Sequence, residues 1–157
     1  MEPNIGIVTK KRKEVAKILN ELLADEYVLY TKTLKFHWNV QGIVFHDFHA
    51  LFKEQYEALF DIADDIAERA RTLGEPAFGT MAEFIKHSRL KEEPGKNPDA
   101  VGMIKNLLTD HETIIRQMRK DLETCQNLGD MGTNNFLTEI MERHEKKAWM
   151  LRATASK

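Results

Sequence analysis

Histidines and acidic residues gather in the first half of the chain, and both types can bind a metal. The aromatic-rich segment KFHWNVQGIVFHDFHALF, residues 35–52, contains His37, His46 and His49, and it is followed by Asp61, Asp64, Asp65 and Glu68. Asp64 and Glu68 are four residues apart, so on a helix they share one face and can converge on a cation. Imidazole and carboxylate donors without a thiolate suit Fe(II), Mn(II) or Zn(II) better than soft metals.

The distance between the two halves of this set decides where a metal site can form. Asp64 lies fifteen residues after His49 on one expected helix, about 22 Å along the axis at 1.5 Å per residue. His49 and Asp64 therefore cannot bind one ion within one chain. If two copies of the helix cross antiparallel about a two-fold axis, the histidine end of one meets the acidic end of the other, which gives two equivalent sites.

A purely structural interpretation of the same residues stays open at this point. Acidic side chains on a helix usually face water and pair with basic neighbours, here Arg69 and Arg71. A histidine at the edge of an apolar face is often a hydrogen-bonded core residue. His46 and Asp47, close to His49, are expected to face solvent.

Composition limits the class of protein. The chain has 157 residues, 42% hydrophobic and 31% charged, which fits one folded domain. Its net charge of -2 argues against a generally basic nucleic-acid binder. The single cysteine, Cys125, excludes an intrachain disulfide framework and fits a reducing compartment. The sequence shows no apolar signal core and no apolar run near the ~18 residues that span a bilayer, so we expect a cytoplasmic protein without a membrane segment.

Hydrophobic periodicity predicts four long amphipathic helices that position the candidate ligands. They are expected over residues 9–36, 45–73, 98–125 and 133–153. Gly74 should end the second as a C-terminal cap, and Asn97 with Pro98 should begin the third. The apolar stripes of the last two are expected to include Val101 and Trp149. Thr80 and Glu83 form a capping-box pattern that predicts a short fifth helix between the second and third.

The long connection over residues 73–97, with its own short helix, indicates the overall topology. Connections in helix bundles usually have about 2–8 residues, and a long crossover is a feature of ferritin-like bundles. We therefore predict one all-α domain over residues 1–157, a ferritin-like four-helix bundle, with residues 1–8 a flexible N-terminal tail and 154–157 a short C-terminal tail. No histidine has Glu three residues before it, so the Glu-x-x-His ligands of an intrasubunit di-iron site are missing.

The combination FHWNVQG, FHALF and DDIAERARTLG resembles the Dps family, the DNA-protection-during-starvation proteins or mini-ferritins. The resemblance extends over nearly the whole chain, from YTKTLKFHWNV through LGEPAFG to HEKKAWMLRA. It implies a hollow homododecamer that oxidises iron(II), usually with hydrogen peroxide, at dimer interfaces and stores iron(III) mineral inside. The family's ligands fall on His37 and His49 of one subunit and on Asp64 and Glu68 of the other.

The resemblance also implies a role for each ligand. Asp64 and Glu68 would neutralise the cation and favour the higher iron charge. His37 and His49 would bind as neutral donors, so acid should weaken the site. Trp38 is expected to pack and to hydrogen-bond through its indole rather than to take part in redox chemistry.

One position departs from the family pattern. Many members have an acidic residue four positions after the second histidine, where this chain has Lys53. A cation there would repel a second metal ion if it pointed inward, whereas it would leave the site alone if it faced solvent or paired with a carboxylate. We expect one firm iron site per half-interface and a weak second one.

Two further features bear on partners. The basic run TKKRKE, with Lys10, Lys11, Arg12 and Lys13, is either a DNA-contacting tail or the solvated first turn of a helix. By resemblance, Asp121, Glu123 and Asp130 would line a three-fold pore. The predicted function is iron(II) oxidation and iron(III) storage that protects the cell and its DNA. The alternative is a shell of the same fold that acts mainly as a DNA-binding or structural assembly, with weak oxidase activity.

Overall fold

The computed structural model describes residues 2–156, with Met1 and Lys157 outside the described part. Five helices form the whole of its regular structure over these residues. They are α1 (Thr9–Asn39), α2 (Phe45–Thr72), α3 (Met81–His87), α4 (Ala100–Leu128) and α5 (Met131–Ala155). Four long helices with a short one in the crossover confirm the predicted ferritin-like bundle.

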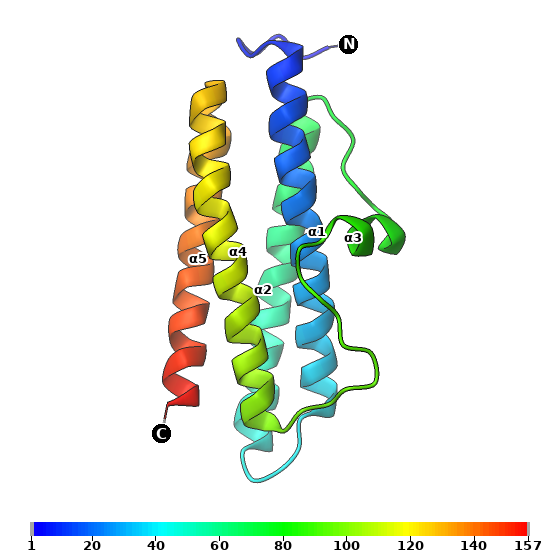
Figure 1. Cartoon of the computed structure of the whole chain (residues 1–157), viewed down its shortest axis with the longest axis vertical. Helices are drawn as coiled ribbons and strands as arrows, with labels where there is room; N and C mark the ends of the chain where they lie inside the picture. Colours follow the sequence, from blue (N-terminus) through cyan, green and yellow to red (C-terminus); the bar gives the residue numbers. More distant parts are fainter. Residues whose placement is uncertain (1, 157) are drawn as a thin grey trace.

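The four long helices form two antiparallel hairpins that pack side by side (Figure 1). One hairpin is α1 with α2, and the other is α4 with α5. The crossover from α2 to α4 runs along the outside of α1 and carries α3 (Figure 1). The ring of Phe84 in α3 stacks on Tyr27 of α1 with centroids 4.0 Å apart, which holds the short helix on the outside of the bundle.

Local sequence signals mark several of the helix ends, although α1 and α2 begin without a side-chain cap. The predicted capping box is confirmed, because Oγ1 of Thr80 accepts from the Glu83 amide at 3.3 Å and Oε2 of Glu83 accepts from the Thr80 amide at 3.0 Å. Gly74, with φ of 89°, follows α2 as predicted. The predicted start of α4 at Asn97 and Pro98 was wrong. Asp99 caps that helix instead, since its Oδ1 accepts from the Gly102 amide at 2.7 Å.

The core lies along the shared axis of the two hairpins and is filled by leucine, isoleucine, methionine and Phe52. The predicted stripes of the second hairpin are confirmed along most of their length, because Ile104, Met118 and Cys125 of α4 and Ile140 and Leu151 of α5 are buried. They were wrong at Val101 and Trp149, which are 46% and 62% exposed. An apolar stripe that covers one face of a helix does not exclude an exposed apolar residue at its edge.

A buried carboxylate fixes the crossover to α1. Oδ1 of Asp25 accepts from the Arg89 amide at 2.6 Å and from the Ser88 hydroxyl at 3.0 Å, and its Oδ2 accepts from Nε of Arg89 at 2.7 Å. On the same helix, the Asn20 amide donates to the Pro76 carbonyl at 3.0 Å and accepts from the Phe78 amide at 2.8 Å. The long connection is therefore held along its length by side chains of α1.

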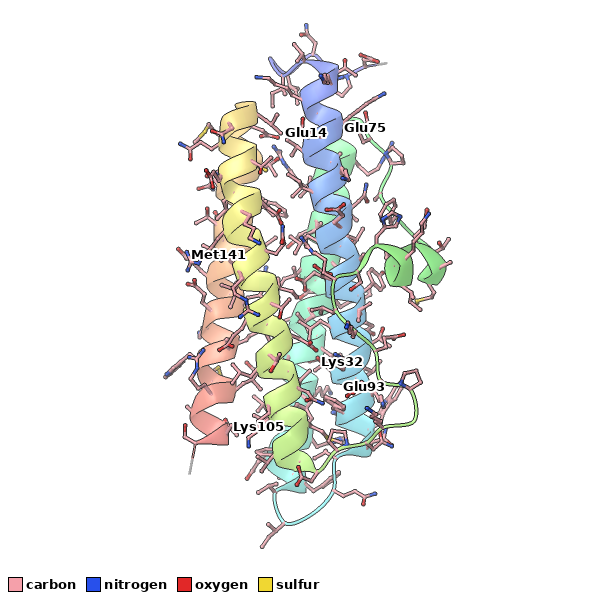
Figure 2. All side chains as sticks on the ribbon, viewed as in Figure 1. Glu14, Lys32, Glu75, Glu93, Lys105 and Met141 are labelled. Carbon is pink, nitrogen blue, oxygen red and sulfur yellow. The ribbon has the colours of Figure 1, made fainter. Side chains whose placement is uncertain are left out.

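Lysines of α1 hold the second half of the crossover. Nζ of Lys35 donates to the carbonyls of Glu93 and Lys96 at 3.2 and 2.7 Å. Lys32 pairs with Asp110 of α4 at 2.6 Å, and Figure 2 shows Lys32 on the bundle beside Glu93 of the crossover. Within residues 2–156, no helix is both long and apolar enough to cross a membrane.

Candidate metal centre

His37 and His49 meet where α1 ends and α2 begins. Their rings stack with centroids 3.7 Å apart and an interplanar angle of 22°. Nδ1 of His37 lies 2.8 Å from the carbonyl oxygen of His49, and Nδ1 of His49 lies 2.8 Å from the carbonyl oxygen of His37. Because a carbonyl oxygen only accepts, each Nδ1 must carry the proton and donate it.

This pair of reciprocal bonds defines the chemistry of both rings. With the proton on Nδ1, the lone pair of a neutral imidazole lies on Nε2, the atom left free to bind a metal. Metal-binding histidines commonly donate their other N–H to a carbonyl or carboxylate, which fixes the tautomer and the ring orientation. The two histidines expected from the family resemblance are thus brought together, and each is held in the tautomer that a ligand needs.

The two predicted carboxylates lie elsewhere on α2, exposed on its surface. Neither Asp64 nor Glu68 has a side-chain hydrogen bond or ion pair within the described part of the chain. The arginines that would neutralise them in the structural interpretation have other partners. Arg69 donates to Thr133 and Asp130, and Arg71 donates to the Glu75 carbonyl. The two acids are therefore exposed anions without a local counter-ion.

The geometry agrees with the separation expected from helix rise. Residues 49 and 64 lie on one continuous helix, fifteen residues and about 22 Å apart. Across residues 2–156, no three histidine, cysteine, aspartate or glutamate side chains converge closely enough to hold a metal ion in one subunit. A site that uses all four residues needs two chains.

Lys53 is exposed and pairs with a carboxylate of its own helix. Its Nζ lies 3.8 Å from Oε1 of Glu57, and both side chains are more than half exposed. His46 and Asp47 are exposed, as expected. Trp38 is 68% exposed, so the predicted packing role is not seen within the subunit.

One residue of the basic run makes hydrogen bonds inside the subunit, and the other three are exposed. Arg12 is buried and donates to the carbonyls of Leu73 at 3.1 Å and Ile7 at 2.7 Å, so it ties the start of α1 to the end of α2. Lys10, Lys11 and Lys13 are exposed in the first turns of α1, so the helical interpretation of this segment holds.

Of the three predicted pore residues, only Glu123 faces solvent in the subunit. Asp121 is buried and lies 3.5 Å from Arg89, and burial raises the pKa of its carboxyl. Asp130 is buried as the N-cap of α5 and pairs with Arg69 at 3.1 Å. Both carboxylates hold helix ends and the crossover together inside the subunit, which leaves Glu123 as the exposed acid of the three, and the pore between subunits stays a prediction.

Cys125 is a core residue without a ligand role. It is fully buried, and burial raises the pKa of its thiol to about 12. We expect no reaction of Cys125 with a thiol reagent at pH 8 in the folded protein, because only the thiolate reacts rapidly. Stoichiometric labelling after urea denaturation is the control, and rapid labelling without denaturant would contradict the prediction.

A buried polar cluster that the sequence interpretation missed lies inside the bundle. Glu26 of α1, His111 of α4 and His144 of α5 are each fully buried. His111 was placed correctly on the inner stripe of its helix but taken as a filler of the core. Glu26 looked like an ordinary surface residue, and only the unbroken burial of α1 from Leu22 to Glu26 distinguishes it.

The fold defines a ferritin-like protein, and comparisons with known proteins agree. The model of the ferritin-like domain matches residues 16–157. A low temperature-induced protein of Nostoc sp., described as uncharacterized, is 46% identical over 151 residues, covering 96% of this chain and 84% of the relative. DNA protection during starvation protein 2 of Bacillus anthracis is 37% identical, covering 90% of this chain and 96% of the relative.

Among solved structures, the Dps protein of Vibrio cholerae superposes with a TM-score of 0.93 at 32% identity. The match covers 99% of this chain and 97% of that one. The chain belongs to the Dps family of the ferritin-like superfamily.

Proposed function

We propose that this protein oxidises iron(II) at sites shared between two subunits and stores the iron(III) product in a closed shell. The observation that supports this most directly is the stacked pair of His37 and His49, whose Nδ1 atoms are both tied to carbonyl oxygens. Each Nε2 atom therefore keeps a lone pair that can bind a metal ion. The exposed, unpaired carboxylates of Asp64 and Glu68 would complete the site from the partner subunit.

The proposed reaction transfers two electrons from iron to peroxide, and each ligand has a role in it. Two iron(II) ions each lose one electron to hydrogen peroxide, whose O–O bond breaks, and two protons are taken up to give two water molecules. Asp64 and Glu68 stabilise iron(III) more than iron(II), because Coulomb attraction to an anion grows with the charge of the cation. His37 and His49 hold the ion as neutral donors, and a proton on Nε2 would abolish that role.

Assembly is part of the proposal, because a single subunit has only half of each ligand set. The hairpin of α1 and α2 exposes Trp38, Phe45 and Phe60, which are 68%, 44% and 51% exposed. Aromatic side chains of this size on the same hairpin as the ligands support an interface there. Two-fold pairing gives two sites per dimer, and the family's dodecameric shell is the expected assembly.

The test is an anaerobic iron(II) titration followed by a peroxide pulse. We compare the native protein with the His37→Ala/His49→Ala double variant and with His46→Ala, which removes an exposed histidine of the same segment. Fast oxidation in the native and His46→Ala shells, lost in the double variant with assembly intact, is the expected result. Equal slow rates in all three would contradict the proposal.

A shell that mainly contacts DNA is the second candidate, and the exposed Lys10, Lys11 and Lys13 favour it. Twelve copies of such a weak cationic segment add avidity. Binding through phosphate contacts falls steeply with salt. A gel shift at low salt that disappears at moderate salt, in a shell without fast iron oxidation, would favour this candidate over the oxidase.

Lys53 offers a prediction about a second iron ion. Lys53→Glu replaces an exposed cation near the histidine pair by a carboxylate, which should raise the number of iron(II) ions bound per site from one toward two. Anaerobic titration calorimetry measures this number. Glu57→Gln, which removes the partner of Lys53 without adding an anion, is the control and should leave it unchanged. An unchanged number in Lys53→Glu would show that the position lies outside the site.

A further inference from the structure

Three buried side chains from three helices form a continuous polar chain through the centre of the bundle. Nε2 of His144 lies 2.9 Å from Oε1 of Glu26, and Nδ1 of His144 lies 2.9 Å from Nδ1 of His111. None of the three side chains is exposed. Within residues 2–156, both oxygens of Glu26 and the Nε2 atoms of His111 and His144 have no hydrogen-bond partner.

The position of this chain in the fold gives it a mechanical role. Glu26 belongs to the first hairpin, whereas His111 and His144 belong to the second. The contact between Glu26 and His144 therefore crosses the dry interior between the two hairpins. The pair of Lys32 and Asp110 joins the same two hairpins nearer the surface, at 2.6 Å.

We propose that Glu26, His144 and His111 form a proton-operated clamp that holds the two hairpins together at neutral pH and releases them in acid. The hydrogen-bonding rules of imidazole support the first half of this statement. Two Nδ1 atoms 2.9 Å apart need one proton between them, so one ring donates and the other accepts. On the other side of the same ring, Nε2 of His144 lies 2.9 Å from the buried carboxylate of Glu26, so the ring that shares this proton also spans the two hairpins.

The second half follows from what one more proton does. The contact between the two Nδ1 atoms has room for one proton, so a second proton there would place two N–H groups opposite each other. Burial first, and then the neighbouring charge of His144 and of Lys147, lowers the pKa of His111 well below its ordinary value of 6.5. Below pH 6.5 the unfolded chain therefore binds a proton at His111 that the native bundle does not bind. The contribution of His111 to the free energy of unfolding is present above pH 6.5 and is lost as the pH falls below it.

The other charged groups facing the cluster do not replace His111 in this role. Lys147, one turn after His144 on α5, remains a cation in acid, although burial lowers its pKa. Glu54 of α2 and Arg143 of α5 act on Lys147, and Arg143 lies 3.8 Å from Asp65 at the surface. The buried polar residue of α2 is Gln55, which carries no charge.

The test measures urea unfolding of the assembled protein from pH 8 to pH 4.5. Native protein is compared with His111→Gln, whose amide oxygen can still accept from His144, and with the exposed-site control His46→Gln. One proton taken up on unfolding raises the unfolding equilibrium constant about tenfold per pH unit. The native protein and His46→Gln should show this extra slope below pH 6.5, and His111→Gln should lack it. Equal slopes in all three would overturn the proposal.

A second measurement on the unmutated protein applies even if His111→Gln fails to fold. Cys125 is fully buried in α4, so labelling of its thiol by 4,4′-dithiodipyridine, which stays reactive in acid, reports opening of the bundle. Labelling should accelerate at least tenfold between pH 7 and pH 5. A labelling rate that stays constant or falls over this range would refute the clamp, whatever the variant does.

Discussion

Shells assembled from two different inactive subunits should regain about one quarter of the native rate of iron oxidation. One subunit carries His37→Ala/His49→Ala and the other carries Asp64→Asn/Glu68→Gln. Random pairing of equal amounts makes about half of the dimers mixed, and each mixed dimer has one site with all four native ligands and one with none. About one quarter of all sites are then complete, although neither variant alone has any.

The measurement is peroxide-dependent iron oxidation by the two separate shells and by the co-expressed mixture, normalised to assembled protein. Each separate shell should react at the background rate. A mixture of the separately assembled shells, combined without subunit exchange, is the control and should also stay at background. Absence of recovery in the co-expressed shells would show that the four residues do not form shared sites, even if each double variant is inactive.

The largest effect on stability is expected at Asp25, which is not one of the proposed metal ligands. Asp25→Ala leaves the guanidinium of Arg89 without its main partner and the Arg89 amide without an acceptor. Removing one partner of a buried ion pair typically costs about 3–5 kcal/mol. Urea unfolding of the native protein and the variant measures this loss at constant pH.

Asp65→Ala is the matched control for that experiment. Asp65 also pairs with an arginine, Arg143, at 3.8 Å, but about half of each side chain is exposed. Exposed pairs contribute about 0–1 kcal/mol, so this variant should unfold almost as the native protein does. A similar small loss in both variants would mean that the crossover is held mainly by the stacking of Phe84 on Tyr27 rather than by Asp25.

The sequence was sufficient for the bundle and for the separation of the ligand halves, because both depend on helical periodicity. Helix rise alone places His49 and Asp64 on one helix but about 22 Å apart. It cannot show that His37 and His49 exchange hydrogen bonds with each other's carbonyls, since that depends on how the chain turns between residues 39 and 45.

Buried polar residues were the hardest to predict. A charged residue is expected at the surface from sequence, because charged side chains are seldom fully buried without a partner. The structure instead buries four of them, namely Glu26, Arg12, Asp121 and Asp130. Their partners come from distant parts of the chain, such as Arg89 for Asp121 and Leu73 for Arg12. Hydrophobic patterns do not record such pairs.

The start of α4 was misplaced because two adjacent residues, Pro98 and Asp99, can each begin a helix.

All four proposed ligands lie between residues 37 and 68, on the first hairpin alone. This hairpin is translated before any part of α4, and chains begin to fold from the N-terminal end. Every ligand that the chain contributes to the proposed iron site has thus been translated while about half of the 157 residues are still to be added. Changes in α4 and α5 can then alter the stability of the subunit without changing a single ligand.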